Sequence, residues 1–579
     1  MLEFWARQFR LRDEHTQSNS TPRPQEPITM VVSPIRAVVA AILLVCIAST
    51  DAQVAGMMMN LPALVMNAML RHRQASPLTF EQKKDKAIAF VRKQMEQFAV
   101  PGMALTVVFK NKTVLTEGFG TKQFGRLDTP VTSTTQFQIG SVSKTFTALC
   151  IAKLVDDGNV QWSDRVKQHL NWTLMDKYAE EHTTLSDLLA MNSVFGTEDS
   201  DFSWSMGLYP TEEEAIAALS LFNTTRPLRA GWSYSNINYE ILGQVVAAVT
   251  NQTWFDYLDA AILKPLGMHD TVPFAAKGSQ LSHGHKVCNG NVAGPFDLLS
   301  DTIVSPPLSF GPIAAGSIVS TAADMATLTT FLLNKGQGLF KSPSVIGAMT
   351  TGHEVIDGVT PELLEFMGYF SYKPAGNVIG AGYGFDFAGN ILFGKDYFSK
   401  NGATATFMAE TAYVPSHQLG VTLLMNAIPM GGDLRATMLT AQIRSYVAGL
   451  FLDIPDAELD AMHDQAMDHL LLVIGGQVPA CDVHMFDNKP LATPGVTMSS
   501  QVRASLVGAY TASNAFYGHA TITAQGNDLV LQYGNFSGAL YPTKDVSKLL
   551  WDSGVYVSPI TVQGPGRFVM QGKLSFVRS

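Results

Sequence analysis

Cysteine is scarce in this chain, with four residues among 579. Cys46 lies within an apolar run near the N-terminus, and Cys150 falls on the apolar stripe of a predicted helix, where a buried free thiol is the simplest interpretation. The remaining two, Cys288 and Cys481, can form at most one disulfide. The sequence therefore excludes a network of disulfides as the source of stability.

Charged residues are also few, at 15% of the chain, and the net charge is −9. No stretch rich in lysine and arginine stands out, so the sequence gives no electrostatic support for a nucleic-acid partner. The hydrophobic content of 46% excludes a disordered chain and supplies a large core. The length predicts several structural units rather than one.

The apolar run near the N-terminus is short. It covers residues 37–48, twelve residues, whereas a membrane-spanning helix needs roughly 20. The run follows Arg36 and precedes small residues, which is the arrangement of a signal peptide. We expect residues 1–52 to be an N-terminal extension and signal peptide, with translation from Met1 or Met30, and the protein to be secreted. If the signal is not cleaved, residues 37–48 instead anchor a single-pass membrane protein.

Acceptor tripeptides for N-glycosylation follow this segment. They have the form Asn-x-Ser/Thr and stand at Asn111, Asn171, Asn223, Asn251 and Asn535. These tripeptides agree with the expectation of a secreted glycoprotein.

Three widespread catalytic motifs are missing from the sequence. There is no Gly-x-Ser-x-Gly of the α/β-hydrolases, no His-Glu-x-x-His of the zinc peptidases and no Gly-x-Gly-x-x-Gly after a predicted strand. The histidines are scattered, and we interpret them as surface or packing residues rather than ligands. We therefore expect neither a metal nor a cofactor.

Regular patterning begins near residue 79. Residues 53–78 are apolar and rich in methionine, and we interpret them as an arm or pro-segment. An amphipathic helix is predicted over 79–100, and two alternating apolar runs predict a hairpin over 101–120. A second hairpin is predicted over 404–427, and a closing helix over about 433–450.

Two early strands and at least two late ones, with helices between, predict an α+β domain. Its antiparallel sheet is assembled from both ends of residues 79–454, and a helical insert covers about 156–334. Residues 455–500 combine acidic and proline-rich stretches, so we interpret them as a connector. Residues 501–579 read as strand after strand with a turn at Gly526-Asn527, which predicts a small all-β C-terminal domain.

The first chemical motif is Ser141-x-x-Lys144, at the start of a predicted apolar helix. Residues three apart on a helix share a face, so the hydroxyl and the amine would lie side by side. A serine hydroxyl becomes a nucleophile when a neighbouring base removes its proton. The alternative is a helix-capping serine followed by a surface lysine.

Two further motifs strengthen the first. Tyr234-Ser235-Asn236 precedes another predicted helix, where a phenol could relay a proton and an amide could hold a substrate amide. Lys400-Asn401-Gly402 leads into a predicted strand, where glycine permits close approach and the next backbone amide could face an oxyanion. Taken alone, each of these motifs is also an ordinary turn.

Together the three motifs resemble the serine β-lactamase and penicillin-binding-protein superfamily, particularly the class C β-lactamase-related branch of serine hydrolases. The phrases "ILKPLGMHDT" (262–271) and "AAGSIVSTAADMA" (314–326) make the resemblance more specific, and it covers about residues 80–450. It implies a β-lactamase-like antiparallel sheet flanked by helices. The C-terminal region is similar to the lipocalin-like domain that many members carry.

The resemblance also implies catalytic roles. Ser141 would be the acylated nucleophile, and Lys144 and Tyr234 would share the acid and base work. The backbone amides of Ser141 and Ala403 would form the oxyanion hole.

Substrate binding would fall to the other motif residues. Asn236 would hold the acyl side, while Lys400, followed by Asn401 and Gly402, would influence both the tyrosine and any substrate carboxylate. The family usually has Thr or Ser where this chain has Asn401, which favours substrates other than carboxylate-bearing β-lactams. Met191 to Ser193 replace a His-Thr-Ser-Gly-like turn, so we also expect an altered cleft wall.

Two functions remain open from the sequence. The first is a secreted serine hydrolase that cleaves an ester or amide of a small molecule or peptide through an acyl-enzyme on Ser141. The second is a catalytically inactive relative that serves as a binding or scaffold protein. The sequence predicts neither the substrate nor the oligomeric state.

Overall fold

The computed structural model describes residues 77–196, 206–224, 226–301, 311, 313–356, 379–429, 438–473, 481, 485–486, 491–493, 495–554 and 557–579. The chain divides into two compact units, Met1–Gln82 and Lys83–Ser579. The N-terminal extension, the signal peptide and the arm predicted over 1–78 lie outside the described residues, apart from 77 and 78. Within the described residues no helix combines the length and the apolar character needed to cross a membrane.

A large antiparallel sheet organises the second unit. Among the described residues it has nine strands in the order β2-β1-β13-β12-β10-β9-β8-β7, with β11 paired to β12. Its strands are β1 (Gly102–Phe109), β2 (Lys112–Gly120), β7 (Glu354–Val355), β8 (Gly380–Ala381), β9 (Phe387–Leu392), β10 (Lys395–Ser399), β11 (Asn401–Ala403), β12 (Met408–Val414) and β13 (Leu419–Met425). Both predicted hairpins are present, and β1 pairs with β13 from Met103↔Met425 to Phe109↔Leu419. The predicted α+β sheet built from both ends of the domain is confirmed.

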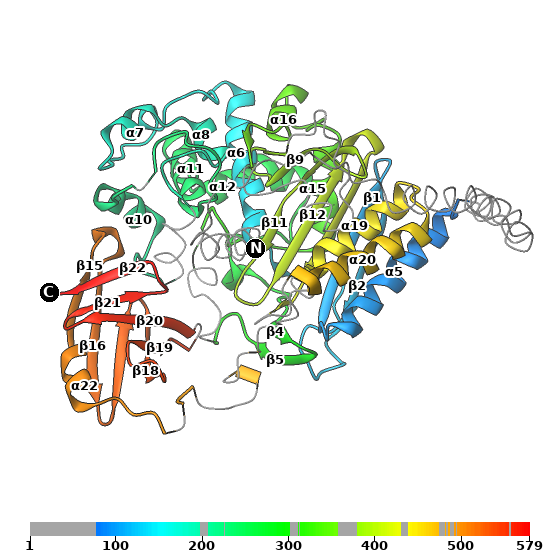
Figure 1. The fold of residues 1–579 in the computed structure, drawn as a ribbon. Helices are drawn as coiled ribbons and strands as arrows, with labels where there is room; N and C mark the ends of the chain where they lie inside the picture. Colours follow the sequence, from blue (N-terminus) through cyan, green and yellow to red (C-terminus); the bar gives the residue numbers. More distant parts are fainter. Residues whose placement is uncertain are drawn as a thin grey trace, which may run out of the picture. The chain divides into compact units, whose positions relative to one another are not determined.

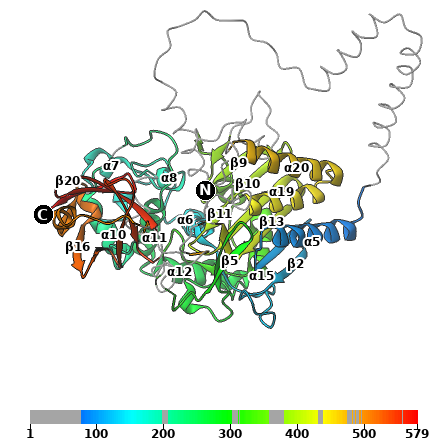
Figure 2. The same ribbon diagram turned by 60° about the horizontal axis from the view of Figure 1, so that its bottom comes forward.

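Helices cover both faces of this sheet. Side chains alternate along a strand, so Ala104 and Val108 of β1 join the main core with α6 (Ser143–Asp157) and α15 (Ala322–Leu333). The opposite face packs against α19 (Leu439–Phe451), the described part of the predicted closing helix. In Figures 1 and 2, α19 lies alongside α20 and α5.

The predicted connector contains a helix that the sequence analysis missed. This helix, α20 (Asp456–Val473), contacts α19 through a hydrogen bond from Tyr446 Oη to Asp460 Oδ1 at 2.8 Å. The Nε2 atom of His463 in α20 lies 3.3 Å from Nε2 of Gln94 in α5 (Phe80–Gln97). The first part of residues 455–500 therefore extends the helical layer.

The region between the two hairpins is mainly helical, as predicted. Its helices are α7 (Lys177–His182), α8 (Leu185–Leu189), α10 (Glu212–Ala218), α11 (Asn236–Thr250), α12 (Trp254–Leu258) and α13 (Lys264–Leu266), followed after α15 by α16 (Pro343–Met349). Several begin with a threonine whose Oγ1 accepts a hydrogen bond from the backbone N–H three residues later, and each is followed there by Asp or Glu: Thr184, Thr211, Thr253 and Thr321. Two small sheets were not predicted: β14-β4-β5, with β4 (Gly284–Cys288), β5 (Asn291–Phe296) and β14 (Ala427–Pro429), and β3-β6, with β3 (Phe137–Gln138) and β6 (Val319–Ser320).

The C-terminal all-β prediction is confirmed by a closed barrel. After α22 (Ser500–Leu506), each strand pairs antiparallel with the next, and the last pairs with the first. The strands are β15 (Gly508–Ala512), β16 (His519–Gln525), β17 (Asp528–Tyr533), β18 (Phe536–Pro542), β19 (Lys548–Asp552), β20 (Val557–Gly564), β21 (Arg567–Met570) and β22 (Leu574–Arg578). Buried aromatic side chains, among them Trp551 and Phe568, pack in its core.

The barrel contacts the segment around α10. Asn535 N donates to Met206 O at 2.8 Å, and Tyr209 Oη donates to Phe516 O at 2.6 Å. Phe222 packs edge-on against the ring of Phe516 with centroids 5.1 Å apart. Both polar and apolar contacts therefore join the barrel to the segment that begins at Met206.

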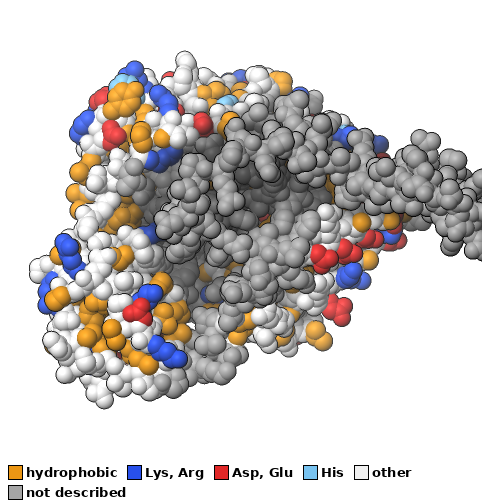
Figure 3. All heavy atoms as spheres, viewed as in Figure 1, with side chains coloured by type: hydrophobic (Ala, Val, Ile, Leu, Met, Phe, Trp, Pro, Cys, Tyr) orange, Lys and Arg blue, Asp and Glu red, His pale blue; other side chains and the backbone are white. Residues whose placement is uncertain are grey.

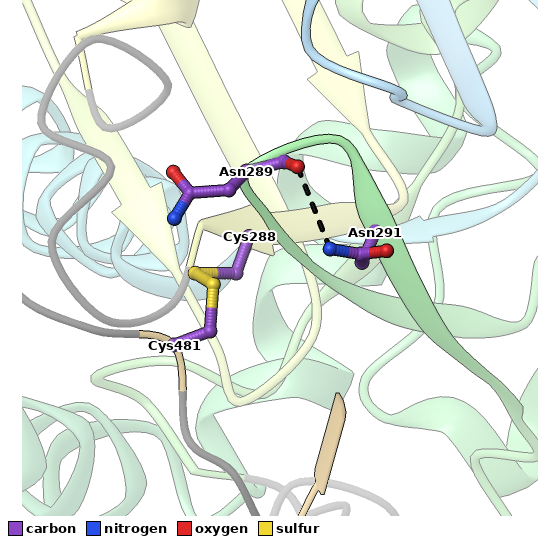
Figure 4. Close-up of a disulfide and its surroundings, with 4 residues drawn as sticks. All are labelled: Cys288, Asn289, Asn291 and Cys481. Atoms are coloured by element: carbon purple, nitrogen blue, oxygen red, sulfur yellow. Dashed lines mark hydrogen bonds between the residues drawn. A yellow bond between two sulfur atoms is a disulfide. The ribbon is translucent and has the colours of Figure 1, made fainter. Parts of the chain in front are cut away.

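A disulfide joins Cys288, at the end of β4, to Cys481 in the connector region (Figure 4). The β4–β5 turn beside it is closed by Asn291 Nδ2, which donates to Asn289 O at 3.5 Å. Cys150 is a buried free thiol, as predicted, and burial raises its pKa far above the ordinary value. The only pairing that the sequence left open is thus the one observed.

Candidate active site

Ser141 and Lys144 meet at the start of the buried helix α6. Ser141 lies in a 3-10 turn, η1 (Gly140–Val142), directly before α6, and is partly exposed, whereas Lys144 is fully buried. The Lys144 Nζ donates to Ser141 Oγ at 3.0 Å and to the backbone oxygen of Ala315 at 2.8 Å. The hydroxyl of Ser141 and the amine of Lys144 therefore lie side by side, as expected. Ser141 belongs to the 3-10 turn and Lys144 to the regular helix that follows it.

Tyr234 and Asn236 come from the N-terminus of α11, where Ser235 is the N-cap. The hydroxyl of Tyr234 donates to Ser141 Oγ at 2.6 Å. Asn236 Oδ1 accepts from Lys144 Nζ at 2.5 Å. Two helices distant in sequence thus bring four of the predicted site residues into one hydrogen-bonded group around the serine hydroxyl.

The third motif lies beside this group, at the junction of β10 and β11. β11 contacts η1, the turn that leads into α6, and Figures 1 and 2 show β11 close to the start of that helix. Gly402 approaches the η1 backbone so closely that a Cβ there would lie 2.0 Å from Ile139 O and 2.9 Å from Ser141 N. Gly140, with φ +51°, is equally confined, since its Cβ would lie 2.7 Å from Ala403 N. The two glycines hold the backbone amides of Ser141 and Ala403 on adjoining segments.

Lys400 is buried, with 1% of its side chain exposed. Its Nζ forms an ion pair with Asp386 Oδ2 at 2.8 Å and donates to the backbone oxygen of Asn401 at 2.9 Å. It also lies 5.3 Å from the centre of the Tyr234 ring, and Lys144 Nζ lies 4.9 Å from the same centre. The sequence analysis missed Asp386, and no spacing in the sequence relates it to Lys400.

The segment 314–326, quoted above for its sequence, contributes a backbone carbonyl to the site that the three motifs did not predict. Besides the Ala315 carbonyl, Ala314 O accepts from Thr147 Oγ1 of α6 at 2.8 Å, and Ala314 N donates to Glu212 Oε1 at 2.9 Å. Burial and the nearby carboxylate of Glu240 raise the pKa of Glu212 well above its usual range. This segment fixes the carbonyl that accepts from Lys144.

The segment from Met191 to Ser193 contacts the region around Tyr234 at the start of α11. Met191 adopts a positive φ of 60°, and its backbone oxygen accepts from Ser233 N at 2.8 Å. The hydroxyl of Ser193 donates to Asn238 Oδ1 in α11 at 2.7 Å. These contacts fix the start of the helix that carries Tyr234 and Asn236.

Comparison with known proteins identifies the family. The model of the Beta-lactamase family matches residues 87–444, and the chain therefore belongs to this family of serine hydrolases. The chain is 25% identical over 350 residues to the unguisins hydrolase ungD' of Aspergillus campestris, covering 58% of this chain and 60% of that protein. It is 27% identical over 224 residues to the protein flp of Staphylococcus aureus, covering 34% of this chain and 42% of that protein. The matches thus span about half the length of these relatives.

A solved structure shares the fold. The octameric penicillin-binding protein homologue from Pyrococcus abyssi superposes with a TM-score of 0.52 at 18% identity, covering 85% of this chain and 99% of that chain. This likeness concerns the fold. The predicted resemblance to β-lactamases and penicillin-binding proteins is confirmed by the family match and by this neighbour.

Charge on the surface is mixed. On the face seen in Figure 3, the lysine and arginine side chains of the described residues are scattered among neutral and acidic ones. Nucleic-acid binding depends on gathered positive charge, and that face does not present it among the described residues.

Proposed function

We propose that this protein is a secreted serine hydrolase that cleaves an ester or amide bond through an acyl-enzyme on Ser141. The observation that carries the proposal is the contact of the hydroxyl of a partly exposed serine with two proton-transfer groups. Ser141 Oγ lies 3.0 Å from Lys144 Nζ and 2.6 Å from Tyr234 Oη. A hydroxyl held between an amine and a phenol is the arrangement of an activated nucleophile.

The contacts of Lys144 indicate which group accepts the proton of the Ser141 hydroxyl. Its Nζ has three oxygen acceptors, from Ser141, Asn236 and the backbone of Ala315, which match the three donors of an ammonium group. We therefore assign Tyr234 as the proton acceptor. Its phenol donates to Ser141 Oγ at 2.6 Å, and once the phenol has lost its proton the Ser141 hydroxyl donates to the phenolate across the same contact. The ammonium of Lys144, 4.9 Å from the centre of the Tyr234 ring, stabilises the phenolate.

The reaction then follows from the positions of these groups. Ser141 Oγ attacks the substrate carbonyl carbon as its proton passes to Tyr234, and the amides of Ser141 and Ala403 stabilise the oxyanion. Tyr234 returns the proton to the leaving alcohol or amine as the bond to it breaks. Water then attacks the acyl-enzyme carbonyl and gives its proton to Tyr234. Tyr234 passes that proton to Ser141 Oγ as the acyl–oxygen bond breaks, which releases the acid and restores the serine.

A fluorophosphonate probe tests the nucleophile. We expect it to label the native protein and to lose its target in Ser141→Ala, together with all turnover of p-nitrophenyl acetate. Ser143→Ala is the matched control, because Ser143 lies two residues away, is fully buried, and has a hydroxyl that accepts from Ile318 N at 3.1 Å. Equal labelling and turnover in the native protein and Ser141→Ala would refute the proposal. Absent labelling and turnover in all three would favour the inactive binding protein.

Several features support the secreted state. The signal-like N-terminus and the Cys288–Cys481 disulfide both fit an oxidising compartment. The asparagines of all five glycosylation tripeptides are exposed, and three of them lie at chain turns: Asn111 between β1 and β2, Asn251 after α11 and Asn535 between β17 and β18. Expression of the full chain in a eukaryotic host should yield protein in the medium whose mass falls on treatment with a peptide N-glycosidase. Recovery in the carbonate-resistant membrane fraction would instead support the single-pass alternative.

A further inference from the structure

The charge of Lys400 is balanced by a carboxylate that is built into the site. Asp386 lies at the end of the loop before β9, and its side chain is 11% exposed. Its backbone N–H donates to Ser399 O at 2.9 Å. In the same loop, Gly384 O accepts from Thr145 Oγ1 at 2.7 Å, and Gly384 N donates to Tyr239 Oη at 2.8 Å. Strand β10 and helices α6 and α11 therefore hold the loop that presents Asp386.

This pairing changes what Lys400 offers a substrate. A fixed lysine beside the nucleophile would attract a carboxylate on the substrate, but Asp386, within 2.8 Å of the same ammonium, repels it. Burial to 1% exposure and the bond to Asn401 O further confine the ammonium. The next charged pair behind the motif, Glu410 with Arg444, is also balanced, at 2.8 Å and 5% exposure of each side chain.

We propose that Asp386 makes the site selective for acyl substrates that carry no carboxylate near the scissile bond, namely neutral esters and amides. The proposal rests on the acyl-enzyme function assigned to Ser141. It makes Asp386 a specificity-determining residue that acts through Lys400. A peptide substrate would accordingly be cleaved at a bond away from its free C-terminus.

A matched pair of esters tests this selectivity. The esters 3-acetoxybenzamide and 3-acetoxybenzoate share the acyl group and differ in the charge of the leaving group. For the native protein we expect kcat/KM for the neutral ester to exceed that for the anionic ester by about tenfold or more. In Asp386→Asn, which keeps an oxygen acceptor for Lys400, we expect this preference to fall by about tenfold through a gain on the anionic ester.

Asp396→Asn is the matched control. Asp396 lies on β10, and removing its charge changes the net charge by the same amount. Its carboxylate accepts from the backbone N–H of Ser416, 2.9 Å from Oδ2, and from the Ser416 hydroxyl, and among the described residues it forms no ion pair with a lysine. We expect it to keep the native preference.

A second measurement needs no variant. Phenylboronic acid and 3-carboxyphenylboronic acid add to a reactive serine, and we expect the neutral compound to inhibit the native protein more strongly. Native preference for the anionic ester and the anionic boronate, with Ser141 labelled, would overturn the inference and leave the proposed function intact. An unchanged preference in folded Asp386→Asn would also overturn it. Absent labelling and turnover would overturn both.

Discussion

The close approach of Gly402 to the turn that carries Ser141 predicts a large effect of adding one methyl group. In Gly402→Ala the new Cβ would lie 2.0 Å from Ile139 O, whereas a carbon–oxygen contact normally needs about 3.3 Å. Strand β11 must therefore move away from η1 by about 1 Å. That movement separates the amide of Ala403 from the amide of Ser141, which the proposed mechanism requires together around one oxyanion.

Displacement of one oxyanion donor by about this distance typically lowers kcat about 100-fold. We expect that loss in Gly402→Ala with p-nitrophenyl acetate, with a smaller change in KM, because the oxyanion forms only in the transition state. Gly347→Ala is the matched control, since Gly347 in α16 has no atom within 4 Å of its added Cβ. Both variants should be checked by thermal unfolding. A folded Gly402→Ala protein whose kcat stays within about threefold of native would refute the oxyanion assignment.

Two further predictions concern stability. Burial lowers the pKa of His285 to about 4, and its neutral ring accepts from Phe124 N through Nε2 at 3.0 Å and lies 2.9 Å from Asn426 O through Nδ1. Its stabilising contribution is therefore present above pH 6.5 and is lost as the pH falls toward 4, by about 3 kcal/mol in total. Urea unfolding at pH 7 and 4.5 should show this loss, and a loss as large in His285→Gln would contradict it. Cys288→Ser, which opens the bond to Cys481, should lower the free energy of unfolding by about 3 kcal/mol while Ser141 still reacts with the probe; an unchanged urea midpoint would contradict this.

The sequence predicted the elements whose signals are local. The hairpins over 101–120 and 404–427 alternate apolar residues around polar turns, and the structure has β1–β2 and β12–β13 there. The helix that follows Ser141 was predicted from its apolar stripe, and the burial of most of α6 explains that pattern. Short runs of alternating apolar and polar residues likewise predicted strands of the C-terminal barrel.

The sequence did not predict contacts that only the folded chain creates. Asp386 stands between two phenylalanines with no motif around it, and it reaches Lys400 only because β9 and β10 are paired. The Ala315 carbonyl is a backbone atom, so no residue type signals it. Helix α20 was not predicted, because its acidic residues and the prolines after it were interpreted as a connector. Its buried residues Leu459, His463 and Ala466 nevertheless have the spacing of one helix face.

The pairing of β1 with β13 has a consequence for how the chain is made. Met103 needs Met425 as its neighbour, and the ribosome adds that partner roughly three hundred residues later. Each strand of the C-terminal barrel, by contrast, finds its next partner within a short stretch of chain. The central sheet is therefore completed late in synthesis, and β1 lacks its β13 partner until then.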